Sequence, residues 1–137
     1  MTENKLEKIF AMQQELNAYV GNKHGIVPLA THMKDATMEE RIEWLLKFNK
    51  ALGKESNELD DCYVWKWWAD DQGDFNWQNA KVEIVDILHF FVSMCLCVGI
   101  TPQDLYDTYE KKWQINKQRQ DQGYSIAGKT EDDNRNI

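Results

Sequence analysis

A chain of 137 residues is long enough for one domain with a substantial hydrophobic core, but too short for two such domains. Its formal net charge of −7 argues against a general nucleic-acid-binding protein, which would normally carry a basic face. With only two prolines and seven glycines, the composition favours helix.

The cysteines and the apolar segments indicate a cytoplasmic protein. Cys62, Cys95 and Cys97 form no plausible disulfide framework, and we interpret them as small buried side chains in a reducing compartment. The N-terminus lacks the charged and then apolar pattern of a signal peptide. The mostly apolar stretch of residues 90–100 is too short to span a bilayer.

The N-terminal half of the chain predicts two helices separated by a loop. Apolar residues recur at helical spacing over residues 3–19, which predicts the first helix. Glycine, proline and polar residues predict a loop over residues 21–36. Thr37 has the pattern of an N-cap, and Glu40 three residues later completes a capping box. We therefore expect a second helix over residues 37–52.

The pattern beyond this helix is less regular. Gly53 either ends it or lies inside one longer helix, and the pattern leaves both possibilities open. Helical spacing resumes over residues 59–68, and a polar, glycine-containing loop is expected over residues 69–75.

The C-terminal half predicts two further helices. Asp74 or Asn76 can cap a mostly apolar helix that ends at Gly99, a residue suited to the position after a helix. Thr101 and Pro102 fit the start of the last helix, which runs to about residue 120. The polar tail beyond residue 123 would, taken alone, be disordered. No strand pattern stands out, so the expected fold is a single all-α bundle of about five helices.

Two pairs of acidic residues carry the strongest chemical signal. Glu83 and Asp86, followed by His89, recur every three residues on an otherwise apolar helix and so share one face. Glu55 and Glu58 repeat the same step upstream. Carboxylates on so apolar a helix are costly to bury without a cation. Two such pairs on neighbouring helices can hold Mg²⁺, which usually acts on phosphates, so the sequence suggests an enzyme.

Other interpretations of these acids remain open. A single pair such as Glu55 and Glu58 could simply be solvated, and Glu83 and Asp86 could pair with lysine or arginine from a neighbouring helix. His89 could ligate a metal, but a hydrogen-bonded histidine of the core is the commoner case. A set of oxygen ligands favours Mg²⁺ or Mn²⁺ over Zn²⁺.

An aromatic cluster and a basic segment flank the acids. Trp65 follows Glu58 by seven residues, two turns along the same face of a helix, and could hold a flat base. Tryptophans at this spacing are also common in cores. Lysines and an arginine between residues 111 and 119 could clamp phosphate, or could simply be a solvated helix end.

These residues together resemble a known family, the dimeric all-α dUTP pyrophosphatases (dUTPases), which are relatives of MazG-type nucleoside triphosphate pyrophosphohydrolases. Residues 55–59 and 83–90 match the two metal motifs of the family, and 24 residues separate Glu58 from Glu83. Residues 65–68 (Trp-Lys-Trp-Trp) and 76–77 (Asn-Trp) are more specific to the dUTPase branch.

Segments near both ends extend the resemblance. Residues 12–17 are similar to the segment with which the family holds uracil, and residues 109–124 to its phosphate and sugar segment. Residues 128–134 resemble its closing loop with one extra residue. Trp113 stands where the family usually has asparagine, a departure that bears on base or sugar selection.

The resemblance implies a role for each matching residue. Glu55, Glu58, Glu83 and Asp86 would bind two or three Mg²⁺ ions, with Mn²⁺ as a substitute, and Glu55 would orient or deprotonate the attacking water. Gln13 and Asn17 would contact the base, with Trp65 closing over it, and Lys112, Asn116 and Arg119 would hold phosphate and sugar, with Lys129 closing over them. The remaining implied substrate contacts are Lys66, Trp68, His89 and Tyr124.

The resemblance also implies an organisation and a reaction. Residues 1–124 would form the catalytic domain of a homodimer, and the tail of residues 125–137 would order over substrate. The expected reaction is hydrolysis of dUTP to dUMP and pyrophosphate. Two alternatives stay open: a related enzyme acting on dCTP or non-standard deoxynucleotides, and a helical interaction protein whose acids are structural.

Overall fold

The computed structural model of the chain describes residues 3–70, 73–123, 134–135 and 137. Residues 1–99 and 100–137 form two compact units, and each is described by itself. The described residues contain helices and no strand, which confirms the predicted all-α class and the expected number of about five helices. Within these ranges, no single helix is both long and apolar enough to span a membrane. Only the helices α4 (Trp77–Val98) and α5 (Pro102–Asp121) taken together pass such a test, by length and composition alone.

The first helix, α1 (Lys5–His24), is longer than the sequence predicts. The chain leaves it through Gly25, which adopts a left-handed conformation with a φ of 67°. The expected loop over residues 21–36 is wrong in part, because it contains the last turn of α1, the short helix α2 (Val27–Ala30) and the 3₁₀ turn η1 (Met33–Asp35). Here α2 folds back against α1, and a Cβ on the buried Gly21 would lie 2.3 Å from the main-chain nitrogen of Ala30.

The second long helix, α3 (Met38–Leu59), begins as predicted. Thr37 and Glu40 form both hydrogen bonds of the capping box. Gly53 lies inside the helix and does not end it. The predicted helical spacing over residues 59–68 is wrong, because the chain passes through the 3₁₀ turn η2 (Asp60–Cys62) and then leaves helical structure.

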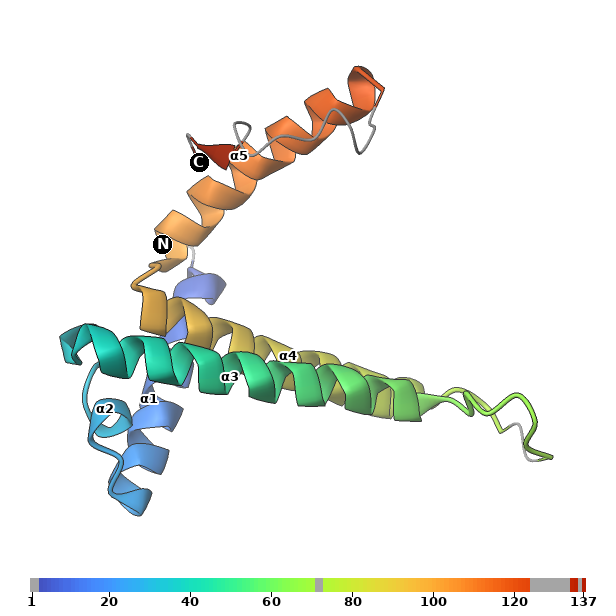
Figure 1. Cartoon of the computed structure of the whole chain (residues 1–137), viewed down its shortest axis with the longest axis horizontal. Coiled ribbons are helices and arrows are strands. Elements are labelled where there is room, and N and C mark those ends of the chain that lie inside the picture. Colours follow the sequence, from blue (N-terminus) through green and yellow to red (C-terminus); the bar gives the residue numbers. More distant parts are fainter. Residues whose placement is uncertain (1–2, 71–72, 124–133, 136) are drawn as a thin grey trace. The chain divides into compact units, whose positions relative to one another are not determined.

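The apolar helix α4 (Trp77–Val98) completes the first unit. Asn76 caps its start, and Gly99, with a φ of 87°, follows its end as predicted. Figure 1 shows α3 and α4 lying side by side along most of their length. A buried cluster joins α2, η1, α3 and α4 through Leu29, Met33, Phe48 and Cys97.

The second unit contains α5 (Pro102–Asp121). Its start is the predicted one: Pro102 occupies the first turn, and Thr101 forms a capping box with Asp104. The residues predicted to lie in the polar tail, from Tyr124 to Asp133, lie outside the described residues.

Candidate active site

Carboxylates from α3 and α4 meet where the two helices lie side by side. Oxygen atoms of Glu55, Glu58 and Glu83 all lie within 4.8 Å of one another. The two residues on α3 are one turn apart, as the sequence pattern requires, and Glu83 faces them from α4. Asp86, one turn beyond Glu83, is outside this group of three, but it acts electrostatically on Glu55.

The electrostatics of this cluster are those of a site that needs a cation. Burial and the nearby carboxyl groups of Glu83, Glu58 and Asp86 together raise the pKa of Glu55 to about 7. The charged groups that shift this pKa are therefore acids and not lysines or arginines.

Glu83 supplies a second, independent observation. Its Oε2 atom is buried and has no hydrogen-bond partner among the residues that the structure describes. A buried carboxylate oxygen without a partner is costly. A divalent cation with oxygen ligands would satisfy this atom and separate the repelling charges, so the residues present fit a magnesium site.

Beside the acids lies an open cleft of about 520 Å³. Glu55 and Asp86 contribute carboxylates to its wall, and Gln13 and Asn17 on α1 contribute amides. The rest of the lining is His89 and a set of apolar and aromatic side chains, namely Leu16, Val20, Ile26, Leu29, Trp44, Phe48 and Phe90. Acids next to amides and aromatic rings could hold a phosphorylated compound with a flat, hydrogen-bonding base.

The aromatic wall was not predicted from the sequence. Trp44 and Phe48 lie one turn apart on α3, with ring centroids 5.7 Å apart, and Phe48 lies 6.4 Å from Phe90 on α4. Phe48 precedes Glu55 by seven residues, so both lie on the same face of α3. This spacing could have placed Phe48 on the side of the acids, but it does not reveal the wall that Phe48 forms with Phe90 of α4.

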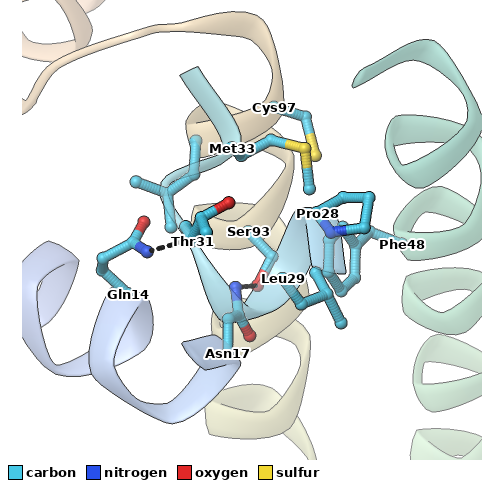
Figure 2. A pocket seen from close by; sticks show the side chains of 10 residues that line it. Gln14, Asn17, Pro28, Leu29, Thr31, Met33, Phe48, Ser93 and Cys97 are labelled. Atoms are coloured by element: carbon cyan, nitrogen blue, oxygen red, sulfur yellow. Dashed lines mark hydrogen bonds between the residues drawn. The ribbon is translucent and has the colours of Figure 1, made fainter. Parts of the chain in front are cut away.

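Hydrogen bonds tie the amides of α1 to His89. The Nδ1 atom of His89 lies 2.6 Å from Oε1 of Gln13, and Gln13 Nε2 donates to Oδ1 of Asn17 at 2.9 Å. Asn17 Nδ2 then donates to the hydroxyl of Ser93 at 3.2 Å, as Figure 2 shows. His89 is thus a hydrogen-bonded residue beside the acid cluster. Ser93, one turn after His89 on α4, was not singled out from the sequence.

The tryptophan segment does not reach the cleft. Trp65 packs edge-on against Trp68, with 6.0 Å between ring centroids, and Lys66 Nζ lies 5.5 Å from the centre of the Trp65 ring. None of the three is among the described residues that line the cleft. The inference that Trp65 continues the helical face of Glu58 is wrong, since α3 ends at Leu59.

The predicted phosphate residues belong to the second unit. Lys112, Asn116 and Arg119 recur at helical spacing on α5 and so share one face. Arg119 Nη1 donates to Oδ1 of Asn116 at 3.5 Å, and Lys112 Nζ donates to Oδ1 of Asn134. The other two predicted substrate contacts, Tyr124 and Lys129, lie outside the described residues.

Comparisons with known proteins give two findings. A family model described as dUTPase matches residues 5–103, the part of the chain that carries the acids, the amides and His89. A dCTP pyrophosphatase of Enterobacteria phage T4 is 29% identical over 111 residues, covering 72% of this chain and 63% of that protein. The chain thus spans somewhat less than two thirds of that relative. No solved structure matches the chain at a significant level.

Proposed function

The chain belongs to the all-α dUTPase family, and from this premise we propose that it hydrolyses dUTP to dUMP and pyrophosphate. One observation carries the proposal. The cluster of Glu55, Glu58 and Glu83, with its unpartnered buried oxygen, lies next to a cleft lined by amides and aromatic rings. A nucleoside triphosphate has the matching parts, a chain of phosphates that binds Mg²⁺ and a flat base that forms hydrogen bonds.

Glu55, Glu58, Glu83 and Asp86 would hold two or three Mg²⁺ ions, with Mn²⁺ as a substitute. The bound metal would neutralise charge on the phosphate oxygens and make water more acidic. A cation between the acids would also stabilise the ionised form of Glu55, whose pKa is otherwise raised. We assign to Glu55 the orientation of the attacking water and acceptance of its proton.

The nucleoside would occupy the cleft. Gln13 and Asn17 would donate and accept hydrogen bonds at the edge of the base, in agreement with their place in its wall. His89 would support this end of the site through Gln13. Trp65, with Lys66 and Trp68, would cover the base after a rearrangement of its segment, because in the present structure it packs on Trp68.

We propose sugar and phosphate contacts for three residues of α5. Lys112, Asn116 and Arg119 offer cationic and amide donors from one face of α5, which suits phosphate and sugar oxygens. We propose that residues 1–124 form the catalytic domain and that the tail of residues 125–137 orders over the substrate, with Tyr124 and Lys129 as further contacts.

A homodimer is part of the proposal. A groove of about 430 Å³ between α1 and α4 is lined largely by apolar side chains, including Met12 and Leu88. Several of these side chains are exposed in the single chain, although apolar area of this kind is normally covered. A second copy of the chain would cover it. Sedimentation of wild-type protein and of Leu88→Glu tests this point, and a monomeric wild type would contradict it.

The cytoplasm is the compartment that we propose. Cys62, Cys95 and Cys97 are buried free thiols, as expected in a reducing environment.

A second nucleotide is a candidate substrate. The phage relative is named a dCTP pyrophosphatase, and Trp113 departs from the usual asparagine, so dCTP is the second candidate. A panel of dUTP, dCTP, dTTP and UTP with Mg²⁺, in which pyrophosphate is measured, separates these candidates. We expect dUTP to be the best substrate.

A variant of one acid separates an enzyme from a helical interaction protein with structural acids. Glu58→Gln removes one carboxylate from the cluster and should abolish pyrophosphate release while the protein stays folded, because Glu58 is exposed. Glu43→Gln is the matched control, since Glu43 is an exposed residue of the same helix that forms a surface ion pair with Lys47 one turn later. Equal activity in wild type and Glu58→Gln would refute the metal site.

A further inference from the structure

We propose that Ser93 sets the pyrimidine preference of the cleft by holding the side-chain amide of Asn17 in one orientation. The inference rests on the proposed function, because it takes Gln13 and Asn17 as the groups that meet the base. Ser93 is only 1% exposed and is not among the described residues that line the cleft. It can therefore act on a bound base only through Asn17, as a positioning residue.

The orientation of Asn17 follows from the proton of the Ser93 hydroxyl. The hydroxyl oxygen lies 2.9 Å from the main-chain carbonyl of His89, which can only accept, so the proton points there. The same oxygen must then accept at Asn17, which places Nδ2 of Asn17 on this side (Figure 2). Oδ1 of Asn17 is thereby turned toward Gln13, where it accepts from Nε2.

The remaining contact closes a ring of hydrogen bonds. Because Gln13 presents its Nε2 to Asn17, its Oε1 is left as an acceptor for His89, and the proton of the imidazole must lie on Nδ1. The ring runs from this imidazole through two amides and a hydroxyl to the carbonyl of the same His89. Gln13, like Ser93, is buried.

Reversing the Asn17 amide alone would break the ring at two places. Two acceptors would face each other at Ser93, and two donors would face each other at Gln13. Both pairs involve a buried partner, so water cannot readily replace the lost hydrogen bonds. Asn17 is therefore held in a single orientation as long as Ser93 carries a hydroxyl.

A fixed amide can distinguish uracil from cytosine. At position 4 uracil carries an acceptor oxygen and cytosine a donor amino group, and at position 3 uracil carries a donor N–H and cytosine an acceptor nitrogen. The two bases are thus complementary to opposite orientations of one carboxamide. An amide that is held one way discriminates between them, whereas an amide that rotates freely fits both.

Ser93→Ala tests this role, and Cys97→Ala is its matched control. Cys97 is buried on the same face of α4, one turn after Ser93, and lines the same small cavity (Figure 2), but it takes no part in the ring. With Mg²⁺, Ser93→Ala should reduce the ratio of kcat/KM for dUTP over dCTP by roughly tenfold or more, toward one. The change should appear in KM, with kcat largely kept. Cys97→Ala should keep the ratio.

Two measurements do not depend on activity or on metal. In wild-type protein, nitrogen NMR should find the neutral His89 ring protonated on Nδ1. Calorimetry without metal should show that wild type distinguishes dUMP from dCMP and that Ser93→Ala does so much less. A ring protonated on Nε2, or an unchanged preference in Ser93→Ala, would overturn the inference. Failure of the proposed function alone would appear as no pyrophosphate from any nucleotide, with the difference in monophosphate binding still present.

Discussion

Replacement of Glu55 by glutamine should remove a pH dependence of stability that the acid cluster creates. Without a divalent cation, burial and the neighbouring Glu83, Glu58 and Asp86 raise the pKa of Glu55 from 4.5 to about 7. The unfolded chain releases this proton near pH 4.5, whereas the folded chain keeps it until about pH 7. The folded state therefore binds more protons between these values, and its stability falls as the pH rises from 4.5 to 7.

The size of the effect follows from the same values. One pKa unit corresponds to about 1.36 kcal/mol, so a pKa of about 7 in place of 4.5 sets an upper limit of about 3 kcal/mol. Glu55 is half-buried and Glu58 is exposed, so solvent screens part of the repulsion. We therefore expect a loss of about 1–2 kcal/mol of unfolding free energy from this residue.

Urea unfolding at pH 5 and pH 8 in the presence of a chelator measures this loss. The free energy of unfolding of wild type should fall more between the two pH values than that of Glu55→Gln, whereas Glu43→Gln should behave as wild type. Mg²⁺ should stabilise wild type more at pH 8 than at pH 5, because only the ionised acids bind it. Parallel pH profiles of wild type and Glu55→Gln, or no effect of Mg²⁺ at pH 8, would refute the reasoning.

Four further predictions concern other parts of the chain. Gly21→Ala should lower the free energy of unfolding by about 3 kcal/mol or more, because its Cβ would collide with the main chain of Ala30. Gly53→Ala, in open space inside α3, should raise it by about 1 kcal/mol, and equal urea midpoints for both variants would contradict this. Trp65→Ala should raise KM for dUTP more than it lowers kcat, and a change confined to kcat would exclude Trp65 as a cover for the base. Arg41→Ala should lower the free energy of unfolding, measured by thermal unfolding, by about 1 kcal/mol, because the Nε atom of Arg41 donates a hydrogen bond to a carbonyl in the last turn of α4.

The starts of α3 and α5 and the end of α4 were predictable because their determinants are local. The capping box of Thr37 and Glu40 satisfies donors within a single turn, and the same holds for Thr101 at the start of α5. Gly99 ends α4 because only glycine adopts a φ of 87° without strain. Such signals need no knowledge of the rest of the fold.

The segment after α3 was misinterpreted because contacts distant in sequence determine it. Cys62 accepts a hydrogen bond at its carbonyl from the main chain of Asn76, which brings the two ends of the loop together. Asn79 also donates to the Cys62 sulfur at 3.3 Å. Next to these two ends, the ring of Tyr63 stacks on the ring of Phe75. Aromatic residues that pair across a loop can mimic helical spacing in the sequence.

The candidate site also has one part that local spacing predicts and another that depends on contacts distant in sequence. The two acid pairs were found from spacing alone, because a step of three residues places both carboxylates of a pair on one face of a helix. The Trp44 side of the cleft and the role of Ser93 depend on which helices become neighbours. Spacing within one helix does not contain that information.

Three residues of α1 and α4 separate the cleft from the apolar groove. Gln13, Leu16 and His89 line the cleft beside the acids and also the apolar groove on the surface of the unit. A subunit seated in the groove would therefore touch the residues that hold the nucleoside. Ligand binding and subunit association would then be thermodynamically linked, with the same coupling free energy in both directions, so the affinity for nucleotide would depend on the protein concentration.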